Sequence, residues 1–204
     1  VDGGANQTIL LNASGTASVT TPVLTANSTY NLVSVASATT PVCNTTVSGN
    51  VTITVNALPT ANVTANTICS GTTGTVTFTG TPNAVVTYTV DGGANQTITL
   101  NAAGQYILTT PVLTANSIYT LVSVATTATP ICSQAQTASA TVTITALPTA
   151  AISGTTTICS GSTAVISFTG TAGATVTYTV DGGANQTILL NASGTASVTT
   201  PVLT

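Results

Sequence analysis

The stretch Val90-Asp91-Gly92-Gly93-Ala94-Asn95-Gln96-Thr97-Ile98 organises the chain, because the same nine residues also occur at 1–9 and 180–188. The three copies begin at positions 1, 90 and 180, which are 89 and 90 residues apart. Cys43 and Cys132 keep the same spacing of 89 residues. An internal repeat fixes the unit of folding. A unit of about 90 residues is too long for a solenoid repeat and suits a small autonomous domain.

The motif Ala-Leu-Pro-Thr, at 57–60 and 146–149, marks the boundaries between repeats. Proline ends a strand and holds the residue before it in an extended conformation. We therefore divide the chain into the C-terminal part of one repeat (1–57), a complete repeat (58–147) and the N-terminal part of a third (148–204). Because the chain begins and ends inside a repeat, we expect it to be a segment of a longer array.

The sequence also has a second, longer period. Residues 1–25 are identical to residues 180–204, whereas residues 90–114 differ from both at six positions. Neighbouring repeats therefore differ while next-nearest repeats match. This predicts a higher-order unit of two repeats.

The composition excludes several classes of function. The chain has no Lys, Arg or His, and its three acids are Asp2, Asp91 and Asp181. Without cations it has no phosphate clamp and no footprint for nucleic acid, and without His it has no Ser-His-Asp triad. A Ca²⁺ site needs about six to eight oxygen ligands, usually several carboxylates, and each repeat offers one. We predict no enzymatic activity, no metal and no cofactor.

Alternation of apolar and polar residues gives the period of two that indicates β-strands. Seven short strands are predicted in the complete repeat, and no segment has a helical period; the strands are 61–65, 75–79, 86–90, 96–100, 106–110, 118–124 and 140–145. The Asp91-Gly92-Gly93 sequence supplies a turn. We predict an all-β protein of tandem immunoglobulin-like (fibronectin III/PKD-like) β-sandwich domains. No apolar run approaches the roughly 20 residues of a membrane helix, so no membrane insertion is expected.

Leu113 and Tyr119 lie six residues apart, before and inside a predicted strand, and Leu24 and Tyr30 repeat the arrangement. The spacing resembles the tyrosine corner of immunoglobulin-like sandwiches, in which the Tyr hydroxyl bonds a nearby backbone group. These four residues are predicted to be structural. An ordinary core position for each Tyr is the alternative.

Two cysteines fall in each repeat. Without His or a CxxC motif they do not suit a zinc site, and nothing cationic would lower a thiol pKa for redox catalysis. Disulfides in an extracellular protein are the expectation. Cys69–Cys132 within one domain is the first choice, although a simple immunoglobulin order puts these two residues at opposite ends. The alternative is a disulfide from the Cys69-type loop of one domain to the Cys132-type loop of the next. Cys43 and Cys159 are expected to pair outside this chain.

Threonine occupies the outward positions of several predicted strands, as in Thr75–Thr79 and Thr141–Thr145. Regular threonine arrays occur on ice-binding surfaces, and extended polar faces bind glycans. The simpler interpretation is that threonine favours strands and keeps an uncharged surface soluble.

The motifs Thr-Ile-Cys-Ser-Gly at 67–71, Tyr-Thr-Val-Asp-Gly-Gly at 88–93, Thr-Pro-Val-Leu-Thr-Ala-Asn-Ser-x-Tyr at 110–119 and Thr-Val-Thr-Ile-Thr at 141–145 carry a resemblance. The pattern resembles the Ig-like/PKD-like repeats of giant Bacteroidota cell-surface proteins, and is similar to gliding-motility-type adhesins exported by the type IX system. The resemblance implies a secreted, filamentous protein of the cell surface. It carries over no functional residue, because such repeats are chiefly spacers.

We therefore expect a structural segment of a long extracellular filament or stalk of an adhesin. Its expected partners are adjacent repeats of the same chain or neighbouring copies in a filament, with an extracellular glycan or surface as the external target. The alternative is a glycan- or ice-binding module that acts through its Thr-rich faces or loops.

Overall fold

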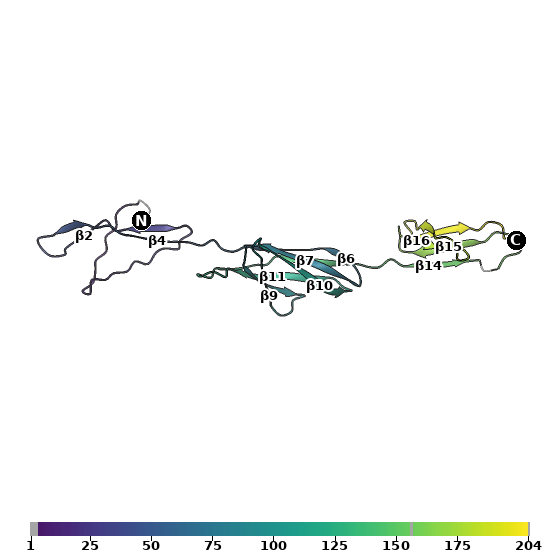
Figure 1. Ribbon diagram of the computed structural model, residues 1–204, viewed down its shortest axis with the longest axis horizontal. Helices are drawn as coiled ribbons and strands as arrows, with labels where there is room; N and C mark the ends of the chain where they lie inside the picture. Colours follow the sequence, from purple (N-terminus) through teal and green to yellow (C-terminus); the bar gives the residue numbers. More distant parts are fainter. Residues whose placement is uncertain (1–3, 156, 204) are drawn as a thin grey trace.

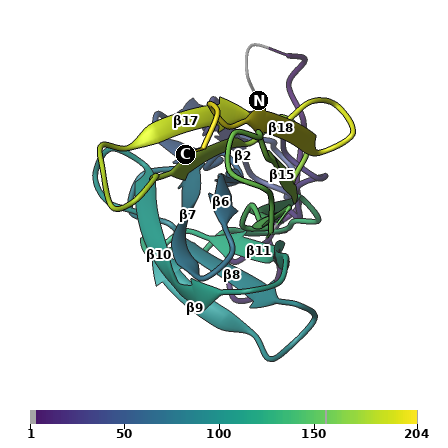
Figure 2. The same ribbon diagram turned by 90° about the vertical axis from the view of Figure 1, so that its right-hand side faces the viewer.

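The protein is all-β in the computed structural model, which describes residues 4–155 and 157–203. Every regular element in those residues is a β-strand, and none is a helix. Figure 1 shows three groups of strands that follow one another along the long axis, and Figure 2 looks along that axis. The predicted all-β class is confirmed.

The middle group is the most complete. Its nine strands are β5 (Ala61–Ala65), β6 (Thr67–Cys69), β7 (Thr72–Gly80), β8 (Val85–Val90), β9 (Gln96–Thr99), β10 (Gln105–Leu113), β11 (Ser117–Ala125), β12 (Ser133–Ala135) and β13 (Ser139–Thr145). One sheet has the order β10-β7-β5, and the other has the order β6-β13-β11-β8-β9, with β12 added to β11.

Both sheets send their inward side chains into one buried cluster. Val76 and Phe78 of β7 alternate with threonines that face outward, and both are 0% exposed. Phe78 meets Tyr88 of the other sheet with ring centroids 4.9 Å apart. Leu121 and Val124 of β11 complete the cluster at 1% and 0% exposed. Two sheets that share one core are consistent with a β-sandwich.

Seven of these nine strands fall where the alternation predicts them. The exceptions are β6 and β12, which the pattern missed because each spans three residues, too short to express a period of two. Cys69 is the last residue of β6, which runs parallel to β13, and it pairs with Thr145 just before β7 begins at Thr72. The predicted turn is present: Asp91 and Gly92 have φ of 51° and 72°, and the Gly93 N–H donates to the Val90 carbonyl at 2.9 Å.

The two outer groups reproduce parts of the middle one. The N-terminal group has four strands and the C-terminal group has five, with bounds β1 (Ser28–Asn31), β2 (Ser34–Ala36), β3 (Asn44–Thr46), β4 (Asn50–Ile53), β14 (Ala150–Gly154), β15 (Val165–Gly170), β16 (Thr175–Tyr178), β17 (Gln186–Leu189) and β18 (Thr195–Thr199). They form the sheets β1-β4, β2-β3, β14-β15-β18 and β16-β17.

The pairing registers repeat with the spacing of the sequence. Ser28 pairs with Ile53 as Ser117 pairs with Val142, 89 residues later. Likewise β14-β15-β18 has the register of β5-β7-β10, and β16-β17 has that of β8-β9. The N-terminal group thus corresponds to β11–β13, and the C-terminal group corresponds to β5 and β7–β10.

The chain enters and leaves the middle group at opposite ends. Ala61, the first residue of β5, pairs with Gly80, and Ala65 pairs with Val76 farther along β7. The chain then continues into β6, whose Cys69 lies beside Thr145 at the end of β13. In Figure 1 this end of the group faces β14. The arrangement carries the chain through each group in one direction.

Candidate functional site

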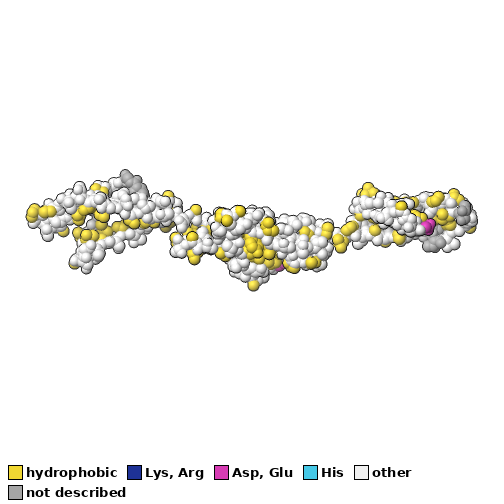
Figure 3. Space-filling view, viewed as in Figure 1, with side chains coloured by type: hydrophobic (Ala, Val, Ile, Leu, Met, Phe, Trp, Pro, Cys, Tyr) yellow, Lys and Arg dark blue, Asp and Glu magenta, His cyan; other side chains and the backbone are white. Residues whose placement is uncertain are grey.

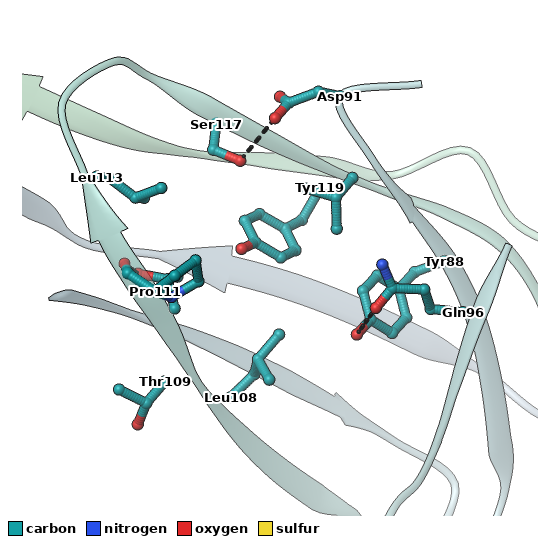
Figure 4. Close-up of a pocket in the computed structure, with 11 residues that line it drawn as sticks. Tyr88, Asp91, Gln96, Leu108, Thr109, Pro111, Leu113, Ser117 and Tyr119 are labelled. Carbon is teal, nitrogen blue, oxygen red and sulfur yellow. Dashed lines mark hydrogen bonds between the residues drawn. The ribbon is translucent and has the colours of Figure 1, made fainter. Parts of the chain in front are cut away.

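A cleft of about 350 Å³ lies between the two sheets of the middle group. Figure 4 shows its wall: Tyr88 and Tyr119 from β8 and β11, Leu108 and Leu113 from β10, and Asp91 at the rim. Its lining comes from β10 of one sheet and from β8, β9 and β11 of the other.

The tyrosines form the back of this cleft. Tyr88 and Tyr119 stack with centroids 6.2 Å apart and an interplanar angle of 25°, and each is 3% exposed. The Tyr88 hydroxyl donates to Gln96 Oε1 at 3.0 Å. Burial raises the pKa of Tyr88 above its ordinary value of 10.0, and the neighbouring hydroxyls of Tyr119 and Tyr106 raise it further. Since the rings are covered, the cleft offers no aromatic face on which a sugar could stack.

Leu113 and Tyr119 both line the cleft, as the tyrosine-corner prediction requires. The hydrogen bond that defines the corner is not formed, however: no bond joins the Tyr119 hydroxyl to the backbone among the residues described. The ring is held by packing against Tyr88 instead. In the N-terminal group, Leu24 and Tyr30 are only half-buried. The structure thus places Tyr119 in the core, as the alternative interpretation expects, whereas Tyr30 is half-buried.

Asp91 was recognised from the sequence as the repeat's only acid, but its role was missed. Its carboxylate accepts hydrogen bonds from Ser117 Oγ at 2.9 Å and from the Ile118 N–H at 2.7 Å. Its own N–H donates to the Ile118 carbonyl at 2.8 Å. The carboxylate therefore locks the turn after β8 onto the start of β11. The recurrence of aspartate in each Val-Asp-Gly-Gly copy was the signal that could have revealed this role.

Asn116 and Thr110 were also missed, and both hold strand ends together. Asn116 Oδ1 accepts from the Ile144 N–H at 2.7 Å. Buried Thr110 Oγ1 accepts from the Gly74 N–H at 2.8 Å, where the β10-β7 ladder has a bulge. Asn116 Oδ1 and Thr110 Oγ1 therefore serve the fold.

The cleft therefore offers few side chains that could bind a metal or take part in a reaction. In residues 4–155 and 157–203, no three His, Cys, Asp or Glu side chains come together as metal ligands would. The one carboxylate at the rim already accepts two hydrogen bonds.

Comparison with known proteins adds no relative. No family model, no curated protein and no solved structure matches the chain. Within the described residues, no helix is both long and apolar enough for a membrane span.

The cysteines mark the two ends of the middle group, and the four in the chain are free thiols. Cys69 lies beside Thr145 at the exit end, whereas the Cys132 N–H donates to Thr126 Oγ1, just past the far end of β11. The nine residues of β11 span roughly 26 Å at about 3.3 Å per residue. A disulfide requires Cα atoms within about 7 Å. The first-choice pair Cys69–Cys132 is therefore not formed, because its members lie at opposite ends of one group.

A threonine face covers the outside of the β10-β7-β5 sheet. Thr75, Thr77 and Thr79 alternate along β7, and Thr64 pairs with Thr77 from the neighbouring strand. Ile107 interrupts the face, 58% exposed and paired with Thr77 from the other side. In Figure 3 the surface is mostly uncharged polar, with hydrophobic side chains on all three groups.

Proposed function

We propose that the chain is a structural repeat segment of a long extracellular filament or stalk of a bacterial cell-surface adhesin. Each repeat of about 90 residues is an immunoglobulin-like (fibronectin III/PKD-like) sandwich, with boundaries at 57/58 and 147/148. The observation that carries the proposal is the path of the chain, which enters the middle group at Ala61 and leaves it at Thr145, at the opposite end. Units connected in this way add length with each repeat.

The chemistry of the unit supports a spacer. Its single carboxylate joins β8 to β11, the rings of Tyr88 and Tyr119 are covered, and polar side chains at the strand ends bond the backbone. A module built to bind or react would leave such groups available. The resemblance to repeats of Bacteroidota surface proteins agrees with this role and with an extracellular location.

The positions of the cysteines support disulfide bonds between neighbouring units. Cys69 lies at the exit end of the middle group, and Cys132 lies at the entry end. The exit end of one unit meets the entry end of the next. A bond from a Cys69-type residue to a Cys132-type residue of the following unit would therefore tie the array together, and Cys43 and Cys159 would take part in the same way.

Electron microscopy of the native assembly tests the stalk. Strands of about 20–25 Å with their loops give a unit roughly 35–45 Å long. The filament should show an axial repeat near this length, and a stronger one at twice the length because next-nearest repeats match. Compact particles without an axial repeat would contradict the proposal.

A glycan- or ice-binding module is the second candidate, and the threonine rows on β5 and β7 favour it. Thr64 and Thr77 lie on neighbouring strands, about 4.8 Å apart. Ice-affinity partitioning and a glycan array with the whole chain test this function. Thr77→Val should abolish binding by this face, whereas Thr141→Val, on the other sheet, should leave it unchanged.

A further inference from the structure

The edge strand β10 of the middle group is nine residues long and is paired on one side. It bonds β7 in the sheet β10-β7-β5, and within the described residues no strand lies along its other edge. Because the Gly80 N–H donates to the Gly104 carbonyl, every second residue of β10 turns its backbone toward β7. The intervening residues Ile107 and Thr109 therefore turn their N–H and C=O groups to the open edge.

This edge lacks the usual protection against pairing with another chain. Natural edge strands carry charged side chains, above all Lys, or are covered by another element. The whole of β10 is uncharged, and its proline, Pro111, comes after the two residues that face the edge. Tyr106 and Ile107 are 37% and 58% exposed. The strand therefore presents apolar side chains beside open backbone groups.

The sequence of this edge alternates between neighbouring repeats. Residues 90–114 and 180–204 differ at six positions, and four of the six are consecutive in β10. Gln-Tyr-Ile-Leu at 105–108 is replaced by Thr-Ala-Ser-Val at 195–198 and again at 16–19. The ladder within the sheet is unaffected, since β18 pairs with β15 in the register of β10 with β7. The alternation thus changes the side chains of the open edge and leaves the sheet intact.

We propose that β10 pairs with β10 of a second copy of this chain, antiparallel and about a two-fold axis at Leu108. Ile107 then lies opposite Thr109 of the second copy, and Thr109 lies opposite Ile107. Each of these two pairs exchanges two main-chain hydrogen bonds, which uses the groups that face the open edge. The two sheets join into one, in the order β5-β7-β10-β10-β7-β5.

The strand itself favours a second copy as the partner. Because β10 is uncharged, its pairing with itself brings no like charges together and needs no opposite charge. The side chains also match under the two-fold axis: Leu108 meets Leu108, and Tyr106 lies diagonal to it, within reach of an aromatic ring. The bulge between Thr109 and Val112 ends the pairing. A strand of another sequence would have to supply this apolar pattern, and a second copy already has it.

The contact needs only the middle group, whereas its repetition along a stalk rests on the proposed function. A two-fold contact uses the same surface on both partners and closes as a dimer. In Figure 1, β10 runs roughly along the long axis, so two stalks would lie side by side in opposite directions. They would touch at every second repeat, where the Tyr-Ile sequence occurs, and contacts repeated along one chain strengthen one another.

Sedimentation equilibrium of the whole chain over a concentration series tests the contact. The wild-type chain should form dimers. The variant Gln105→Thr/Tyr106→Ala/Ile107→Ser/Leu108→Val replaces the edge by the sequence of the neighbouring repeat. It should keep its fold, since β18 has these four residues in the same register. Its dissociation constant should rise by about tenfold or more.

Ile118→Thr is the matched control. It also replaces an exposed apolar residue by its counterpart in the neighbouring repeat, Thr29, but it lies on β11 in the other sheet. It should associate like the wild-type chain. Equal dissociation constants for the wild type and the edge variant would overturn the inference, and so would an equal loss in Ile118→Thr.

A wild-type chain that stays monomeric at every concentration would also overturn the inference and leave the edge to a partner of another sequence. The stalk proposal would remain intact, because it fails only if the native assembly lacks the axial repeat.

Cross-linking tests the two-fold register in a background with the four cysteines changed to serine. Leu108→Cys places two thiols across the axis in a non-hydrogen-bonded pair, with Cα atoms about 4.5 Å apart, which a disulfide can span. Glutathione disulfide oxidises the two thiols and is itself reduced to its thiol. Ile107→Cys is the control, because in this register its two Cα atoms lie beyond the limit of about 7 Å. Covalent dimers should form about tenfold faster with Leu108→Cys, and equal rates would overturn the inference.

Discussion

Leu11 and Leu190 occupy the same position in two identical 25-residue segments, yet Leu190 is 1% exposed and Leu11 is 49% exposed. The Leu190 N–H donates to the Ala174 carbonyl at 2.9 Å, beside β16 and β17. Residues 4–27 contain no strand. The same sequence therefore has two structures, and the strands around it decide which one it adopts.

This dependence predicts unequal effects for two equivalent leucines. Leu121→Ala should lower the free energy of unfolding of the middle group by about 2–5 kcal/mol, the usual cost of a cavity in a packed core. Leu32→Ala, in the counterpart position, should change the stability of the monomeric chain by less than about 0.5 kcal/mol, because Leu32 is already exposed. Urea denaturation at low protein concentration measures both. Equal losses would show that the N-terminal group is packed like the middle one.

The strand pattern was predictable from sequence because alternation is a local property. Thr-Val-Thr-Phe-Thr at 75–79 indicates both the strand and its inward face. Burial was not predictable, since Leu11 and Leu190 have identical neighbours in sequence. Neither was the failure of the Tyr119 hydroxyl to bond the backbone, which depends on how Tyr88 packs against it. The role of Asp91 requires knowing that Ser117, 26 residues later, begins the adjacent strand.

A second prediction concerns the carboxylate that fastens β8 to β11. Asp91→Asn keeps the shape of the side chain and tolerates the positive φ, but it replaces a charged acceptor by a neutral one. The free energy of unfolding of the middle group should fall by about 1 kcal/mol. Asp181→Asn is the control, because within the described residues the Asp181 carboxylate accepts no hydrogen bond. A loss of the same size for both variants would show that the charge itself matters rather than the bonds to Ser117 and Ile118.

A third prediction concerns pH. With three acids and no basic side chains, the stability of the chain should be nearly constant between about pH 5 and 9. The folded pKa of Tyr88 is raised above 10.0, so the unfolded chain releases this proton at lower pH than the folded one. The stabilisation is complete below about pH 10 and is lost as pH rises above that value. Tyr88→Phe should make the alkaline fall in melting temperature shallower than that of the wild-type chain. An unchanged slope in Tyr88→Phe would assign the fall to other groups.

A fourth prediction concerns the thiols. In the isolated monomeric chain, Cys69 and Cys132 should both react with a thiol label without denaturant, because they lie at opposite ends of the middle group and the structure gives neither a disulfide partner. Oxidation of dilute chain should therefore not produce a Cys69–Cys132 link. Digestion must avoid trypsin, which has no Lys or Arg to cleave. Finding that link in the monomer would restore the pairing within one domain.

The native assembly should show no thiol labelling if disulfides join its units end to end. Labelling of denatured, unreduced material should then find no free thiol, and the linked peptides should join a Cys69-type residue to a Cys132-type residue of another unit. Cross-linked units lose less entropy on folding, an effect of several kcal/mol for long loops in the chain-entropy model. Reduction should therefore lower the melting temperature of the assembly while leaving that of the dilute chain unchanged. Quantitative labelling of the native assembly would rule these disulfides out, and the Leu-Pro linkers would then be the sole covalent connection between units.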